Sequence, residues 1–226
     1  MVSRSNLSIS DRASIEPSGS VFTQHHDARN HVFGTCWTAD NTDLMYVNIP
    51  KNASSWTKPN LISLGWNEHN YQRENLHHKH AIVVLRDPLV RWLSGVGEYF
   101  SLYNPNVDLP KAGKAFFELV LDLVTLDDHT ERQVYFIDGL DHSNCTYFYC
   151  DNNYSSMFEH FLNFKGIRNR FSRFNYQHTT EQSEMRSMIT KYFAPMLDDP
   201  KNINHIKNHY KLDYDLINRV KFYGHR

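Results

Sequence analysis

The stretch "AIVVLRDPLVRWLSG", from Ala81 to Gly95, decides the fold class. Its first part, Ala81–Leu85, is an apolar and largely β-branched run between polar residues, which predicts a buried strand. After the polar turn "RDP", apolar side chains recur at helical spacing: Leu89, Trp92, Leu93, Val96, Tyr99 and Phe100. A buried strand that leads directly into an amphipathic helix is typical of α/β proteins with a parallel sheet.

The same arrangement occurs earlier in the chain, in "DLMYVNIPKNASSW". The near-continuous apolar run over Asp43–Ile49 predicts a short buried strand that Pro50 ends. Ser54 or Ser55 is a suitable cap for a helix after it. Pro59 then predicts that this helix is short or kinked.

The remaining apolar segments complete the prediction of a single domain over residues 21–226. Strands are predicted at 134–137 and 146–150, and helices at 116–124, 155–164, 181–193, 201–209 and 213–222. The expected architecture is α/β, with a central parallel sheet flanked by helices and a helical C-terminal part. Residues 1–20 are polar and rich in serine, and we expect them to form a flexible tail.

Composition limits the classes of function. The formal charge is -1, from 24 Lys+Arg and 25 Asp+Glu, so no global field favours nucleic acid or a membrane surface as a partner. No run reaches the roughly 18–20 apolar residues of a membrane span, and the N-terminus has no apolar leader region. Three cysteines, Cys36, Cys145 and Cys150, favour a reducing compartment. We therefore expect a cytoplasmic protein.

The two strand-to-helix turns carry the residues that suit an anion. In an open parallel sheet, ligands bind at the carboxyl ends of the strands, where helix N-termini present free N–H groups. Lys51 adds a charge at the first turn, beside the amides of residues 52–55 and the hydroxyls of Ser54 and Ser55. Arg86 leaves the second strand with a guanidinium suited to a phosphate, and Ser94 lies two helical turns further on. Two such turns predict a ligand with phosphate-like groups at both ends.

These motifs also resemble a known family. "IPKNASSW" together with "VVLRDPLVRWLSG" is similar to the 5′-phosphosulfate loop and the 3′-phosphate motif of sulfotransferases that use 3′-phosphoadenosine 5′-phosphosulfate (PAPS). "DDHTERQVYFIDGL" looks like the His-x-x-x-Gln stretch of the carbohydrate and Golgi-type branch, and "HYKLDYDLINRV" looks like its C-terminal Tyr–Asp–Tyr helix. The resemblance covers most of residues 43–222.

The resemblance implies a P-loop-like sulfotransferase fold, PAPS as co-substrate and no metal. It implies that Lys51 contacts the sulfuryl group, and that Arg86 and Ser94 bind the 3′-phosphate. The donor site it implies comprises Lys51, Asn52, Ala53, Ser54, Ser55, Trp56, Arg86 and Ser94. Ala53 stands where many members have glycine, and alanine fits there if its φ is negative. Trp56 either stacks on adenine or belongs to the core. Arg91 is expected to reach Asp87 or solvent.

The general base is left open by the sequence. A base that accepts the proton of an acceptor hydroxyl or amine is usually His or Glu in this family. The candidates are His129, which precedes a predicted strand, and His69, which lies in the long segment between the first helix and the second strand. Glu68, in the same segment, is a less favoured candidate. His77, His78 and His80 precede the strand that ends at Arg86, so we expect them at the opposite end of the sheet, as a solvated cluster.

The preferred function is transfer of a sulfuryl group to a carbohydrate or small-molecule acceptor. Two alternatives belong to other classes. A P-loop kinase would need a Gly-rich loop ahead of Lys51 and a carboxylate for Mg²⁺. A non-catalytic module of the same fold would keep a nucleotide or glycan site without turnover. The sequence predicts neither the acceptor nor the oligomeric state.

Overall fold

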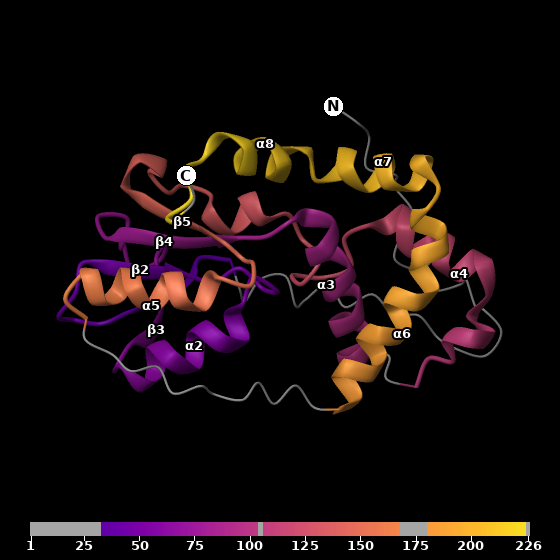
Figure 1. The fold of residues 1–226 in the computed structure, drawn as a ribbon, viewed down its shortest axis with the longest axis horizontal. Helices are drawn as coiled ribbons and strands as arrows, with labels where there is room; N and C mark the ends of the chain where they lie inside the picture. The colour runs from indigo at the N-terminus through magenta and orange to yellow at the C-terminus, as the bar shows by residue number, and fades with distance from the viewer. Residues whose placement is uncertain (1–32, 104–105, 168–179, 225–226) are drawn as a thin grey trace.

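The structure is a computed structural model, and it describes residues 33–103, 106–167 and 180–224. The predicted tail over residues 1–20 lies outside this part of the chain. One five-stranded sheet has the order β3-β1-β2-β4-β5 (Figure 1). Its strands are β1 (Thr35–Thr38), β2 (Leu44–Val47), β3 (Asn67–Asn70), β4 (His80–Leu85) and β5 (Cys145–Tyr149).

The sheet is mixed, so the expectation of a parallel sheet is wrong for two of its four strand pairings. β2, β4 and β5 are parallel neighbours, with Val47 opposite Val83 and Leu85 opposite Tyr149. β1 pairs antiparallel with β2, and β3 pairs antiparallel with β1. β3 has the polar sequence "NEHN" and is half-exposed, so it lacks the apolar run from which a strand could be predicted. Antiparallel edge strands of this kind are common beside a parallel centre.

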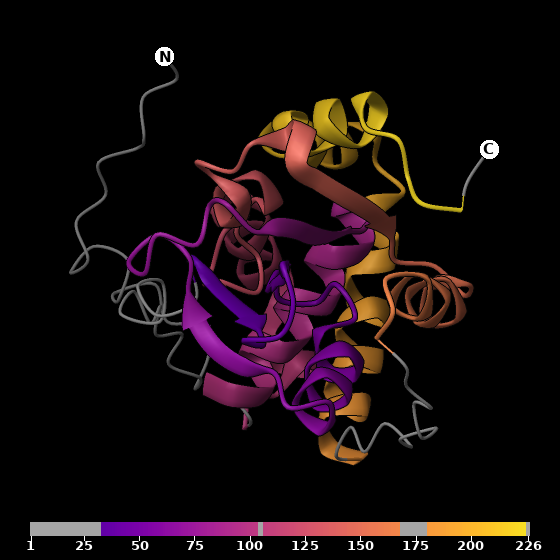
Figure 2. The same ribbon diagram turned by 90° about the vertical axis from the view of Figure 1, so that its left-hand side faces the viewer.

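Helices cover both faces of the sheet (Figures 1 and 2). On one face, α2 (Ser54–Ser63) and α5 (Tyr154–Phe164) pack Trp56, Leu61, Phe158 and Phe161 against strand side chains such as Tyr46 and Phe148. On the other face, the 3-10 helix η2 (Gln133–Ile137) and α8 (Lys211–Arg219) contribute Phe136, Ile137 and Leu216. β2 and β4 alternate their side chains between these two cores, which is why their sequences are apolar throughout.

A third core lies at one end of the molecule, to the right in Figure 1. It is formed by α3 (Pro88–Tyr103), α4 (Leu109–Leu123), α6 (Thr180–Leu197) and α7 (Pro200–His209). Trp92 of α3 is fully buried there against Phe193 of α6, with ring centroids 5.3 Å apart. The predicted helical C-terminal part is therefore confirmed.

One local prediction is wrong. Residues 134–137 form part of η2 rather than a strand, because the N–H groups of Gln133 and Val134 are bound by the Asp213 carboxylate and are not available to a ladder. α2 is 10 residues long and runs through Pro59 to Ser63. Among the described residues no helix is long and apolar enough to cross a membrane.

Candidate functional site

The two cation-bearing turns lie side by side. β2 and β4 are parallel neighbours, so Lys51 and Arg86 leave the same edge of the sheet. The Arg86 guanidinium donates a hydrogen bond from Nη1 to the carbonyl oxygen of Lys51, at 3.0 Å. The predicted meeting of the two turns is thus present in the structure.

The first turn is tightly fixed to the second. Asn52 is fully buried, and its amide nitrogen donates at 2.7 Å both to the Val84 carbonyl and to Oε1 of Gln133. Its side chain therefore holds the turn in place, and its backbone N–H donates to the Ile49 carbonyl at 3.3 Å. Lys51 and Ala53 both have positive φ, 68° and 58°. The condition under which alanine would fit here, a negative φ, is not met at Ala53, and this alanine occupies a conformation that glycine adopts more readily.

α2 begins directly after this turn, at Ser54, with Ser55 exposed beside it. The first N–H groups of a helix have no partner within the helix and carry the positive end of its dipole. Both serines are thus placed for an anion next to Lys51. Trp56 is not: it is 8% exposed, and its ring packs edge-on against Tyr154 and Phe158. Trp56 belongs to the core.

Gln133 joins both turns to the C-terminal helix. Its Oε1 accepts from the backbone N–H of Arg86 at 3.0 Å, and its Nε2 donates to the Arg86 carbonyl at 2.9 Å. Asp213 of α8 accepts the backbone N–H of Gln133 at 2.9 Å. The tyrosine of the same motif, Tyr210, donates its hydroxyl to the Thr130 carbonyl. The His-x-x-x-Gln and Tyr–Asp–Tyr stretches therefore converge on the two turns.

Arg91 contradicts the expectation that it reaches Asp87 or solvent. It is 1% exposed, and its Nε donates to the Pro50 carbonyl at 2.9 Å. Its terminal nitrogens donate to the carbonyls of Glu131 and Asp128. A buried guanidinium bound to backbone carbonyls of two loops is a structural tie, and it aligns the loop over residues 127–132 with the Lys51 turn.

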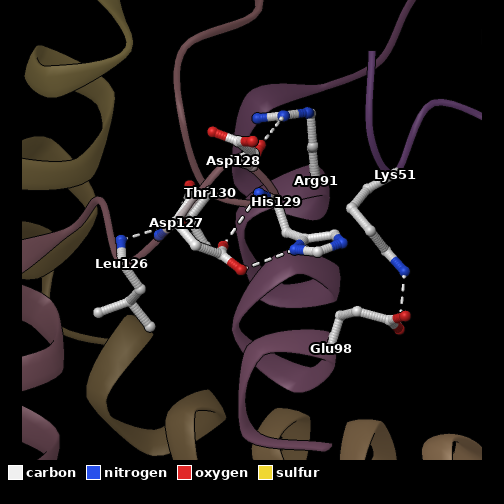
Figure 3. Close-up of polar contacts among 8 residues, drawn as sticks. All are labelled: Lys51, Arg91, Glu98, Leu126, Asp127, Asp128, His129 and Thr130. Atoms are coloured by element: carbon white, nitrogen blue, oxygen red, sulfur yellow. Dashed lines mark hydrogen bonds and ion pairs between the residues drawn. The ribbon is translucent and has the colours of Figure 1, made fainter. Parts of the chain in front are cut away.

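Lys51 forms an ion pair with Glu98 of α3, with Nζ 3.1 Å from Oε2 (Figure 3). Burial lowers the pKa of Lys51, while the Glu98 carboxylate acts against that shift. Burial acts to raise the pKa of Glu98, but the charge and hydrogen bond of Lys51 outweigh it, so this pKa falls below its ordinary value. The pair is largely shielded, with 11% and 17% of the two side chains exposed.

Arg186 of α6 brings a further positive charge to this pair. Its pKa is lowered by burial and by Arg86, and raised by Glu98. A side chain at Gly97 would meet the Cα of Arg186 at 3.0 Å, so this glycine lets α6 approach α3 closely. Lys51 and Arg186 therefore act on one carboxylate, Glu98, and Arg86 acts on both of these cations. The four side chains together carry a formal charge of +2 (three cations minus one anion).

His129 lies beside the ion pair, and its imidazole is fixed by Asp127. Nδ1 of His129 is 2.7 Å from Oδ2 of the fully buried Asp127, and the His129 backbone N–H donates to Oδ1 at 2.9 Å. Figure 3 shows the other ring nitrogen pointing toward the Lys51 side chain. A carboxylate only accepts, so Nδ1 of His129 is the donor of this hydrogen bond, and Nε2 is the ring nitrogen on the Lys51 side.

The helix α3 has a glycine where this loop touches it. A side chain at Gly95 would meet the His129 carbonyl oxygen at 2.3 Å. The neighbouring Ser94 is 5% exposed on the same helix. The absence of a side chain at Gly95 therefore lets the His129 loop approach α3 closely.

The other histidine candidates lie elsewhere. His69 is on β3, separated from β2 by β1, and its Nδ1 is 2.7 Å from the Glu74 carboxylate. The structure does not bring it to Lys51, nor does it bring Glu68, the preceding residue of the same strand. His80 begins β4, at the opposite end of the sheet, as expected, but it is half-buried and hydrogen-bonded to Asn144 and Thr146 rather than solvated.

Three residues of the site were missed by the sequence reasoning. Glu98 follows Ser94 by four residues, so it lies on the same helical face and that spacing was a usable signal. Asp127 stands two residues before His129, within the motif itself. Arg186 comes from a polar helix far along the chain, and no local pattern marks it.

Comparisons of the chain with models of protein families, with curated proteins and with solved structures find no match. The resemblance of the motifs therefore rests on the residues themselves and on the geometry described above.

Proposed function

We propose that this chain is a PAPS-dependent sulfotransferase with the P-loop-like fold of that family. It moves a sulfuryl group to a hydroxyl or amine of a carbohydrate or small-molecule acceptor. The observation that carries the proposal is the contact of Arg86 with the Lys51 carbonyl, since it joins two cation-bearing turns at the carboxyl edge of the sheet. A ligand with an anionic group at each end fits this pair of turns.

The donor site uses backbone and side-chain groups together. The N-terminus of α2, with Ser54 and Ser55, binds the 5′-phosphate, and Arg86 with Ser94 binds the 3′-phosphate. Lys51 contacts the sulfuryl oxygens and the oxygen that bridges sulfur and phosphorus. The positive charge left by Lys51, Arg86 and Arg186 over Glu98 favours such a polyanion.

His129 is the general base in this proposal. The acceptor oxygen or nitrogen attacks sulfur in line, and the bond from sulfur to the 5′-phosphate oxygen breaks. Nε2 of His129 takes the acceptor proton, and Asp127 stabilises the imidazolium that forms. Lys51 offsets the negative charge that develops on the leaving phosphate. No step requires a redox change.

The test is transfer of labelled sulfate from PAPS to a panel of sugars and phenols, followed for the natural sequence and for Lys51→Ala. Loss of Lys51 is expected to lower turnover by about a hundredfold or more, the scale of losing one transition-state donor. Circular dichroism checks that the variant folds. Binding of 3′-phosphoadenosine 5′-phosphate without transfer to any acceptor would favour the non-catalytic module, and absence of binding at millimolar concentration would overturn the proposal.

A further inference from the structure

A cavity lies far from the Lys51 turn, between the edge strand β5, the 3-10 helix η3 (His142–Asn144) and the C-terminal end of α8. Its volume is about 570 Å³, within the range of small-ligand pockets. Its lining comprises His142, Ser143, Cys145, Tyr147, Leu216, Arg219, Val220 and Lys221. Figure 1 shows α8 along the same side of the molecule as β5.

The position of the cavity separates it from the candidate donor site. Cys145 pairs with Ala81 at the amino ends of the parallel strands, whereas Tyr149 pairs with Leu85 at the end from which Arg86 leaves. Four residues of strand span about 13 Å. The two ends of α8 also lie at different sites. Asp213, near its start, is bound to Gln133, whereas Arg219, at its end, lines the cavity.

The charged side chains of the lining have one sign. Arg219 and Lys221 are cationic, and the lining contains no carboxylate. Within the described part of the chain neither forms an ion pair. Arg219 donates from Nε to the Asp215 carbonyl at 3.0 Å, which fixes its stem and leaves its terminal nitrogens available. A guanidinium presented in this way suits an oxyanion.

The rest of the wall is apolar or carries hydrogen-bond donors. Leu216 is 5% exposed and Tyr147 is 4% exposed, so the floor of the cavity is formed by packed side chains of the core. The Tyr147 ring stacks on His142 with an interplanar angle of 14°, and the two side chains share a hydrogen bond. The Cys145 thiol donates to the Asp141 carbonyl. This combination favours an amphiphilic ligand over a bare inorganic ion.

We propose that this cavity binds a small organic anion, with an aromatic or short acyl body against Tyr147, Leu216 and Val220 and an anionic group on Arg219 and Lys221. The anionic group is a phosphate, a sulfate or a carboxylate, since all three accept hydrogen bonds from a guanidinium. The proposal does not rest on the sulfotransferase assignment, because it uses no residue of the Lys51 turn.

Cys145 provides a reporter inside the cavity. Its rate of alkylation by iodoacetamide at mildly alkaline pH is followed by peptide mass spectrometry, with Cys150 as the internal reference. Naphthyl phosphate, naphthyl sulfate and naphthoate are the probes, and naphthol is their uncharged counterpart. The anionic probes are expected to slow alkylation of Cys145 but not of Cys150, at concentrations about tenfold below those that naphthol requires.

The double variant Arg219→Ala, Lys221→Ala is expected to lose this preference for the anionic probes. The variant Lys201→Ala, Lys207→Ala removes the same charge from α7 and serves as the matched control. Calorimetric titration of the probes gives a second reading that does not depend on the thiol. Equal protection by naphthol and the anions, an unchanged preference in the double variant, or no binding of any anionic probe at millimolar concentration would overturn the proposal.

Discussion

The Lys51 ammonium lies 3.1 Å from the Glu98 carboxylate, so the cation proposed to receive the donor is already paired in the free protein. An incoming phosphosulfate must compete with Glu98 for Lys51. Once displaced, Glu98 still faces Arg186, whose charge acts on it. Under the proposed function, breaking this resting ion pair is part of the free-energy cost of donor binding.

Replacing Glu98 by Gln is expected to strengthen binding of 3′-phosphoadenosine 5′-phosphate by about tenfold, because one competing charge is removed from a shielded site. Fluorescence or calorimetric titration measures this. Glu118→Gln, which removes an exposed carboxylate paired with Lys114 on α4, is the control and is expected to leave the affinity unchanged. Weaker or equal binding by Glu98→Gln would show that Glu98 does not compete with the nucleotide.

Asp127 acts through His129 in the proposed mechanism. Asp127→Asn keeps the size of the side chain but removes the charge that orients Nδ1–H and stabilises the imidazolium. Turnover is expected to fall by about a hundredfold while nucleotide affinity stays within about twofold. Steady-state kinetics and titration of the same sample separate the two effects. Asp138→Asn changes an exposed carboxylate near η2 and serves as control; a loss of nucleotide affinity equal to the loss of turnover would contradict this role.

Ala53 is held at φ 58°, a conformation that costs an alanine about 1–2 kcal/mol. Ala53→Gly relieves this strain, although glycine adds about 0.5–1 kcal/mol of unfolded-state entropy. The free energy of unfolding is expected to rise by about 1 kcal/mol, measured by urea denaturation. Ala194→Gly in the exposed part of α6 is expected to have the opposite sign, with a loss of about 1 kcal/mol. Destabilisation by Ala53→Gly would mean that the turn is not left-handed.

Because of the His209 side chain, we expect the folded protein to lose stability in mild acid. Burial lowers the pKa of His209 from 6.5 to about 4, with contributions from Arg132 and His205, and the ring is hydrogen-bonded to Thr125 at 3.0 Å. Between these two values the unfolded chain binds a proton that the folded chain does not, so stability falls as the pH falls. Allowing for solvent screening of a half-buried ring, the loss is about 2 kcal/mol.

The measurement is urea denaturation across this pH window for the natural sequence and for His209→Gln, which can still accept from Thr125. The difference in unfolding free energy between the two is expected to shift in favour of the variant as the pH falls toward 4. His78→Gln, at an exposed position, is the control. A difference that stays constant with pH would show that His209 is not buried in its neutral form.

Sequence patterns predicted the parts of this fold that depend on local apolar order. β4, α3 and the C-terminal helices have long or regular apolar patterns, and they lie where expected. β3 could not be predicted because it is a polar edge strand, paired with β1 alone in the sheet order. The run at 134–137 misled because a short apolar segment is equally compatible with a strand and a buried turn.

The candidate site likewise has residues that the sequence predicted and residues that it did not. Lys51, Arg86 and His129 stand in motifs whose spacing places them at turns, and these turns meet. The prediction for Arg91 was wrong because its burial depends on the loop over residues 127–132. This loop is distant from Arg91 in the sequence, so no local pattern shows their contact. The approach of Arg186 likewise requires Gly97 and the crossing of α3 with α6.

The most direct test of the account compares two nucleotides on one protein. The dissociation constants of 3′-phosphoadenosine 5′-phosphate and of adenosine 5′-phosphate are measured for the natural sequence, for Arg86→Ala and for the control Arg73→Ala, an exposed arginine near the β3 edge. We expect the natural protein and the control to prefer the nucleotide with the 3′-phosphate by about a hundredfold, and Arg86→Ala to lose most of that preference. Equal affinity of the natural protein for both nucleotides, or a preference untouched by Arg86→Ala, would contradict the assignment of these two turns.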